Sequence, residues 1–304
     1  MNAHLAATAL AFYLCAWWCC IGIVLGGLVM VWIHNLSGGA WGEPLRAPLL
    51  DLARHMWLLA LLFAPVLAGT TVLYPWAADA ALGVRRWPHD IAPGGAAFKS
   101  AWLTPAAFML RGIAVLAVWI VLAAMSRSAR WTRSARFAAA ALIVYGITVS
   151  IAAVDWIMSL MPLWYSSVFG LLLATGQACA GLALGTWLAA RHGARPQVLQ
   201  DLGNLLLTAV ITWAYLAFTQ YLIIWAEDLP HETGWYLVRR HGVWPLLAWV
   251  LALGHFALPM LALLSRRLKR SPARLATVAA TLVVMHVLDA CWLVLPSAGA
   301  GAQT

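Results

Sequence analysis

The sequence predicts an all-α integral membrane protein that crosses the bilayer about eight times. Hydrophobic residues make up 64% of the 304 residues and charged residues only 10%, whereas soluble proteins carry about 25% charged residues. The mean hydropathy is +0.85. Apolar runs of about 20 residues, enough to cross roughly 30 Å of hydrocarbon, recur along the chain. They fall at residues 8–33, 57–78, 105–125, 137–161, 164–190, 205–226, 243–264 and 273–295.

The first predicted helix, 8–33, is expected to stay in the protein as a membrane span. It has no basic segment before it and no A-x-A cleavage pattern after it, and it is longer than the apolar region of a signal peptide.

The eight predicted helices are expected to form two four-helix bundles, residues 1–162 and 163–304. A weak internal echo supports the division. Asp155 is followed seven residues later by Pro162, and Asp289 is followed seven residues later by Pro296. Because both segments would cross the bilayer in the same direction, the echo is typical of a parallel repeat.

The basic residues predict the orientation. Of the 19 Lys and Arg residues, 13 lie in the first, third, fifth and seventh connections, five lie on the other side, and Arg111 lies inside a helix. Positive charge gathers on the cytoplasmic side of membrane proteins. We therefore expect a multi-pass protein of the bacterial inner membrane with both termini in the periplasm, and no nucleic-acid partner despite the net charge of +9.

Several ionisable or polar side chains fall inside the predicted helices. Asp155, Asp289, Arg111 and Gln220 each lie about six residues, roughly 9 Å, from an outer helix end. His286 lies one turn deeper than Asp289 on the same helix face, and His255 lies near mid-membrane. The sequence therefore predicts a polar layer in the outer half of the membrane.

Two interpretations of this layer remain open. Arg111 and Asp155 belong to consecutive helices and should meet at matched depth, so the pair could serve only to fix helix register. Alternatively, the layer could conduct protons or bind a ligand, which is the default hypothesis for intramembrane ionisable groups.

Other patterns exclude several site classes. The five cysteines lie in predicted helices without a C-x-x-C spacing, which argues against iron–sulfur clusters, covalently attached haem and structural zinc. We interpret them as packing residues. A b-type haem would need paired histidines, and only His255 and His286 are placed deeply enough. We predict no catalytic residue and no metal site.

Ordered sequence pieces across residues 15–296 resemble the F subunit of bacterial alternative complex III, an NrfD-like membrane subunit of quinol:electron-acceptor oxidoreductases. The pieces include Asp155-Trp156-Ile157-Met158-Ser159-Leu160, Pro162 and Trp164-Tyr165-Ser166, Leu36 to Gly42, Leu59 to Phe63 with Pro65, Tyr74 and Trp76, Phe108 with Arg111, Gln220 to Trp225, Glu232-Thr233 with Trp235-Tyr236, and His286 with Asp289, Trp292 and Pro296.

This resemblance implies two four-helix bundles, lacking one terminal helix of that family at each end. It implies a respiratory subunit that has no covalently bound cofactor. This subunit would contact a quinone and dock onto iron–sulfur and multihaem cytochrome c subunits. The polar layer would then be a proton pathway or a quinone-proximal surface, with Glu227, Asp228 and Glu232 as an outer acidic mouth. Met161 and Leu163 depart from the family pattern, which has an acidic residue and a histidine there.

A secondary transporter is the main alternative function. Transporters also use repeats and polar groups near the midplane, but the predicted layer is off-centre and the helices lack paired Gly/Pro interruptions. Haem absorbance would identify a cytochrome, and co-purifying redox subunits would favour the respiratory function.

Overall fold

A computed structural model describes residues 2–78 and 95–300. The described residues form helices and no β-strand. Seven helices are long and apolar enough to cross a membrane, or eight if the bent pair Glu43–Ala53 and Met56–Ala68 counts as one span. The predicted all-α polytopic membrane fold is therefore confirmed.

Helices of the first half, with the bounds that the structure gives them, are α1 (Asn2–Ser37), α2 (Glu43–Ala53), α3 (Met56–Leu61), α4 (Ala64–Ala68), α5 (Thr70–Leu73), α6 (Pro75–Ala78), α7 (Gly95–Trp102), α8 (Pro105–Arg127) and α9 (Ala135–Ala152). A π-helical turn, Ala153–Ile157, and a 3-10 turn, Met158–Leu160, continue α9.

In the second half the helices are α10 (Phe169–Arg191), α11 (Pro196–Glu227), α12 (Pro230–Val238), α13 (Trp244–Leu251), α14 (Leu258–Leu264), α15 (Arg266–Lys269) and α16 (Pro272–Ala300). A second π-helical turn, Ala252–Ala257, joins α13 to α14.

The prediction of one continuous helix over 57–78 is wrong. This stretch consists of α3 to α6, and a helix that the sequence did not predict, α2, precedes it. Pro65 is the second residue of α4 and Pro75 is the first residue of α6, because proline lacks the N–H that an interior helix position must donate. The predicted fifth helix also starts later, at Phe169 and not at residue 164.

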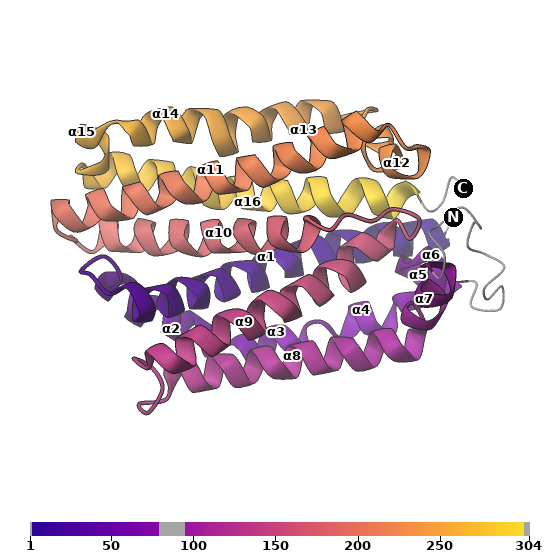
Figure 1. Ribbon diagram of the computed structural model, residues 1–304, viewed down its shortest axis with the longest axis horizontal. Coiled ribbons are helices and arrows are strands. Elements are labelled where there is room, and N and C mark those ends of the chain that lie inside the picture. The colour runs from indigo at the N-terminus through magenta and orange to yellow at the C-terminus, as the bar shows by residue number, and fades with distance from the viewer. Residues whose placement is uncertain (1, 79–94, 301–304) are drawn as a thin grey trace.

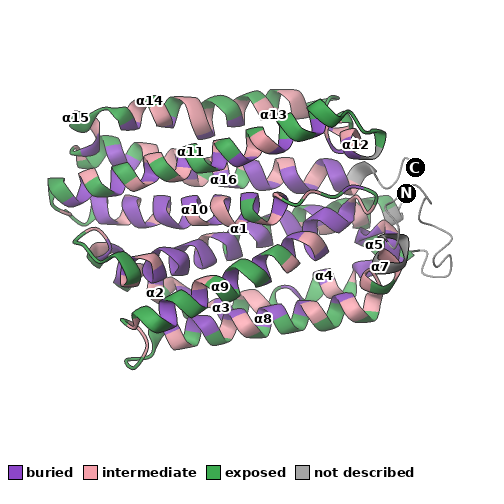
Figure 2. Ribbon diagram, viewed as in Figure 1, coloured by how far each residue is buried: buried purple, intermediate pink, exposed green. Residues whose placement is uncertain are grey.

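Helices α1, α10 and α16 pack against one another at the centre, with α8 and α9 on one side and α11, α13 and α14 on the other (Figure 1). In α1, 83% of the most apolar window is buried, against 22% in the span Trp244–Leu264. Figure 2 accordingly shows α1 and α10 mostly buried and the outer helices with exposed faces. The predicted division into two bundles stays a prediction.

Glycines let α1 and α10 approach closely. A Cβ placed on Gly26 would lie 1.7 Å from the carbonyl oxygen of Gln177, and one on Gly181 would lie 2.2 Å from the backbone of Gly26. Helices in lipid have no hydrophobic driving force for association, so close packing at small residues helps to hold them together. This contact joins the first helix of the chain to the first long helix of the second half.

The start of α1 and the end of α16 lie at the same end of the molecule, together with α5, α6, α7 and α12 (Figure 1). The connections 128–134, 191–195 and 265–271, which carry or adjoin most of the basic residues, lie at the opposite end. Alternate connections therefore share an end, as the charge pattern requires. Which end faces the cytoplasm stays a prediction.

Candidate functional site

Asp155 lies in the π-helical turn that ends α9, and its side chain is 1% exposed. Arg111 donates from Nε to Oδ2 at 2.7 Å and from Nη2 to Oδ1 at 3.1 Å. Trp102 donates its indole N–H to Oδ1 at 2.7 Å. The predicted pair is thus confirmed, and charge-assisted hydrogen bonds of this kind satisfy a buried carboxylate. These three hydrogen bonds explain how a buried carboxylate at Asp155 is stabilised within a predicted membrane span.

Short elements around the pair hold it in place. Thr104 caps α8 by accepting a hydrogen bond from the Ala107 N–H, and Pro105 occupies the first helical position, as is common at helix starts. Arg111 then lies over the Trp102 ring, 4.1 Å from its centroid, and donates to the Trp102 carbonyl at 2.8 Å. The arginine is therefore fixed by a tryptophan as well as by the carboxylate.

The irregular backbone beside Asp155 is satisfied by side chains. Tyr74 donates its hydroxyl to the Trp156 carbonyl at 3.0 Å, and the Ser159 hydroxyl donates to the Asp155 carbonyl. Lys99 donates to the Pro162 carbonyl at 2.9 Å, and burial lowers the pKa of this ammonium group. Departures from α-helix inside a membrane are tolerated when their carbonyls find such partners.

Asp289 lies in a different setting, on the wall of a cavity of about 610 Å³ between α11, α13 and α16. Its side chain is buried, yet no Lys, Arg or His in the part of the chain that the structure describes forms an ion pair with it. Oδ2 lies beside Gly176, 3.7 Å from the position of a Cβ there, and the Trp213 indole nitrogen lies 3.9 Å from the same position. Asp289 is thus a buried acid beside an open space.

The cavity is mainly aromatic. Its lining includes the side chains of Trp213, Tyr215, Phe218, Tyr221, Tyr236, Phe256 and Trp292, and it also includes the amide of Gln220 and the carboxylate of Asp289. Tyr215 and Phe218 are 65% and 61% exposed, so this wall reaches the lipid-facing surface. Gln220 is buried and accepts a hydrogen bond from the Ser166 hydroxyl at 3.2 Å. Such a cavity has the size and lining of a small-molecule site.

Two buried histidines lie next to this region. The His255 ring stacks on the Trp213 ring with centroids 4.0 Å apart, and it belongs to the second π-helical turn. His286 lies against α1, where its Nε2 is 3.0 Å from the Cβ position of Gly22. Both ring nitrogens of His286 and Nδ1 of His255 lack a hydrogen-bond partner among the described residues. Buried polar atoms of this kind need a water, a ligand or a functional reason.

Arg239, which was not among the residues predicted from the sequence, contacts the backbone of the lining residues Trp292 and Leu293. It is buried, and among the described residues no carboxylate forms an ion pair with it. Its Cζ atom lies 3.4 Å from the centroid of the Trp235 ring and 4.8 Å from that of the Trp292 ring. It donates to the carbonyls of Trp235, Trp292 and Leu293 and to the Ser297 hydroxyl. Since Pro296 has no N–H, the Trp292 carbonyl lacks its ordinary partner four residues on, and Arg239 Nε supplies one at 3.1 Å.

The predicted outer acidic mouth is not a single exposed surface. Glu227 ends α11, and Asp228 caps it in a left-handed conformation with φ of 46°. Both are exposed, whereas Glu232 in the first turn of α12 is 7% exposed. The prediction grouped Glu232 with Glu227 and Asp228 in one outer mouth, but in the short helix α12 the side chain of Glu232 is buried.

The predicted polar layer is likewise split into two sites. One contains Arg111 and Asp155, and the other contains Gln220 and Asp289 with the two histidines nearby. Among the described residues no hydrogen bond or ion pair links Asp155 to the second group. Trp156, which is fully buried among Trp17, Trp18, Phe63 and Trp119, occupies the core beside the first site. Matched depth along the helices did not bring all four polar groups together.

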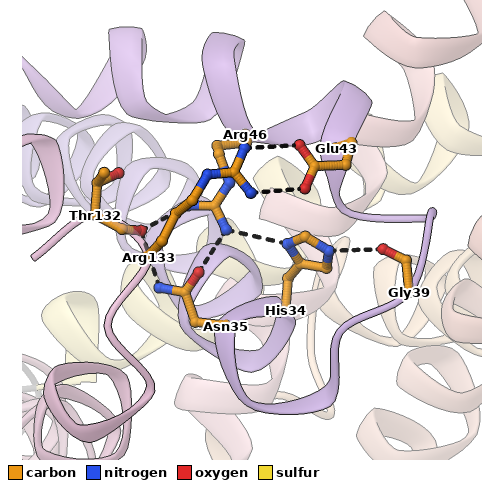
Figure 3. A network of polar contacts seen from close by, with 7 residues as sticks. All are labelled: His34, Asn35, Gly39, Glu43, Arg46, Thr132 and Arg133. Atoms are coloured by element: carbon orange, nitrogen blue, oxygen red, sulfur yellow. Dashed lines mark hydrogen bonds and ion pairs between the residues drawn. The ribbon is translucent and has the colours of Figure 1, made fainter. Parts of the chain in front are cut away.

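Figure 3 shows another polar network that sequence reasoning missed, at the end of the molecule opposite the termini. Arg46 of α2 donates to the Thr132 carbonyl at 2.6 Å, to His34 Nδ1 at 3.1 Å and to Asn35 Oδ1. Arg133 pairs with Glu43, and their hydrogen bond raises the pKa of Arg133. The network ties α1 and α2 to the connection between α8 and α9, which is a structural task. Its sequence pattern, basic residues in a connection between helices, is the same as that of any cytoplasmic loop, so the pattern does not identify the network.

No protein-family model matches the chain, and no curated protein matches it significantly.

Proposed function

We propose that the chain is a membrane subunit of a respiratory quinol:acceptor oxidoreductase, of the alternative complex III type that its sequence pieces resemble. In this proposal the cavity of the second half takes the ring of a quinol. The quinol hydroxyl gives its proton to Asp289, and its electrons pass to iron–sulfur or multihaem subunits bound at the outer side. The single observation that carries the proposal is a buried carboxylate, without an ion-pair partner among the described residues, on the wall of a cavity with an aromatic lining.

The chemistry of the cavity supports a ring with hydrogen-bonding oxygens. Its aromatic lining offers stacking surfaces, and Asp289 and Gln220 offer two polar contacts. Ile211, Tyr215 and Phe218 line the cavity and are also lipid-facing, so a lipophilic molecule could enter from the bilayer. A carboxylate kept without an ionic partner inside apolar surroundings is suited to take up a proton.

His286 supports an onward proton path. It lies three residues before Asp289 and therefore on the same helix face, and both of its ring nitrogens are free of partners among the described residues. Asp155 is assigned a different role. Its carboxylate already accepts three hydrogen bonds, which supports the register interpretation for the first site.

An exposed ion pair supports the subunit role. Asp51 and Arg54, with side chains 62% and 52% exposed, pair at 3.1 Å at the break between α2 and α3. This break lies within the candidate bent span, so Arg54 would belong to a span and not to the predicted first connection. Charges that face lipid within a span are unfavourable. A neighbouring subunit that covers the pair would remove it from lipid.

Photolabelling tests the cavity assignment. The purified chain in lipid nanodiscs is labelled with an azido-quinone, and the labelled peptides are identified by mass spectrometry. We expect labels on α11, α13 or α16. Asp289→Leu should weaken labelling about tenfold, the value of one hydrogen bond to a charged group. Asp201→Leu, a change at an exposed aspartate of α11 outside the cavity lining, is the matched control and should leave labelling unchanged. Labels confined to other helices, or labelling insensitive to Asp289→Leu, would refute the assignment.

A secondary transporter is the second candidate, favoured by the π-helical turn Ala252–Ala257, which interrupts the α-helical hydrogen bonding of the span Trp244–Leu264 beside the cavity. Broken helices line substrate sites in transporters. Purification from native membranes separates the two functions. Co-purification of iron–sulfur or multihaem subunits supports the oxidoreductase, whereas a chain that purifies alone and moves solute into liposomes supports the transporter.

A further inference from the structure

Two cysteines far apart in the sequence meet between α1 and α16. The sulfur atoms of Cys15 and Cys291 are 3.3 Å apart, and the residues are 276 positions apart in the chain. Cys15 is buried, and Cys291 is partly exposed. Neither sulfur belongs to the cavity lining, so the pair is distinct from the quinol site proposed above.

The distance places the two sulfurs within reach of a bond. A disulfide needs a sulfur separation of about 2.05 Å, so the two atoms must approach by about 1.3 Å. Rotation about the Cα–Cβ bonds can supply a movement of this size while the helices stay in place. Cys19, one helical turn further along α1, also hydrogen-bonds the Cys15 thiol. Of the other two cysteines, Cys20 is exposed and Cys179 is buried.

We propose that Cys15 and Cys291 form a reversible disulfide that locks α1 to α16. In the oxidation each thiol loses one proton and one electron, and a bond forms between the two sulfurs. A quinone is the chemical class of oxidant that fits a site inside a bilayer, because it dissolves in lipid and takes up two electrons and two protons to become a quinol. A dithiol reverses the reaction by thiol–disulfide exchange.

The lock would act on the wall of the cavity. Asp289 and Trp292, which line it, flank Cys291 on α16. Helix α1 also packs against α16 and α10. A covalent link between chain segments this far apart restricts the unfolded state strongly, so the oxidised protein should melt at a higher temperature than the reduced one.

Thiol counting tests the proposal on the full chain in detergent or nanodiscs. The reduced protein is treated with diamide or with tetramethylbenzoquinone, whose ring positions are blocked against thiol addition. We expect the five free thiols to fall by two and the intact mass to fall by two hydrogen atoms. Peptide mapping should identify a link between Cys15 and Cys291, and dithiothreitol should restore both thiols.

Matched variants make the result specific. Cys15→Ala and Cys291→Ser should each abolish the loss of thiols, whereas Cys179→Ala, a change at another buried cysteine, should still lose two. Mapping on the wild-type protein gives the answer even where a variant assembles poorly. An unchanged thiol count, or a link through Cys19 or Cys20, would overturn the proposal.

Discussion

The two buried aspartates have similar sequence surroundings and opposite environments. Each is followed seven residues later by a proline, and each half contains an arginine that stacks on a tryptophan and donates to that tryptophan's carbonyl: Arg111 on Trp102 and Arg239 on Trp235. Arg111 also reaches Asp155. Arg239 instead reaches the carbonyls of Trp292 and Leu293.

The difference shows which local arrangement leaves a buried carboxylate free of an ion pair, so that it can bind a ligand or a proton. In the first half the arginine is on α8 and faces the aspartate directly. In the second half the arginine, Arg239, caps the C-terminus of the short helix α12. It donates to the Trp292 carbonyl of α16, which has no helical partner because residue 296 is a proline. Asp289 is left without an ionic partner and lines the cavity. One arrangement builds a structural pair, and the other builds a candidate site.

The largest effect is expected from breaking the first pair. Removing one member of a buried ion pair destabilises by about 3 to 5 kcal/mol, whereas apolar replacement of both can be nearly neutral. Arg111→Ala and Asp155→Ala should each lower the yield and melting temperature of the folded protein. Asp155→Leu with Arg111→Met should restore both, as measured by size-exclusion chromatography and thermal unfolding.

Activity of this double variant then separates the two interpretations of Asp155. If the pair only fixes register, the restored protein should support quinol oxidation when assembled with its partner subunits. An assembled but inactive double variant would return Asp155 to the proton pathway. Single variants as stable as the wild type would show that the pair does not contribute to stability.

Changes at Arg239 are expected to have the next largest effect. Arg239→Ala removes the side-chain donor from the carbonyls of Trp235 and Trp292, whereas the Leu293 carbonyl still accepts from the Ser297 hydroxyl. The loss should cost about 1 to 3 kcal/mol for each carbonyl left without a donor, or about 2 to 4 kcal/mol in total once water solvates this end of the cavity. Pro296→Ala restores an N–H for the Trp292 carbonyl. The double-mutant cycle, followed by thermal unfolding, should therefore give a smaller effect of Arg239→Ala in the Pro296→Ala background. Equal effects in both backgrounds would disprove the link to the proline.

Asp289 should show the smallest effect on stability. Because no ion pair depends on it, Asp289→Asn should change the free energy of unfolding by less than about 1 kcal/mol, within the range of substitutions that break no buried pair. The same substitution at Asp155 strands Arg111 and should be clearly worse. Thermal unfolding of the two variants side by side measures this difference in stability. Equal losses of stability at the two positions would contradict the distinction between the two sites.

Much of the local structure was predictable from the sequence. Apolar runs and helix ends are local properties, so the long helices appear close to their predicted positions. The meeting of Arg111 and Asp155 was also predictable, because consecutive helices with a short connection lie side by side. The break-up of 57–78 was missed because apolar composition does not separate a continuous helix from several short ones when prolines and glycines interrupt it.

By itself, the sequence determined the membrane class, the depth of each polar residue along its helix and the charge difference between the two ends, since composition, helical rise and loop charge are read along the chain. Only the tertiary structure decided which side chains meet. Depth does not fix how a helix is rotated or which neighbour it faces, and π-helical turns at Asp155 and His255 alter the face that follows them. Packing therefore paired Asp155 with Arg111, turned Arg239 toward the backbone of α16, left Asp289 beside a cavity and brought Cys15 to Cys291.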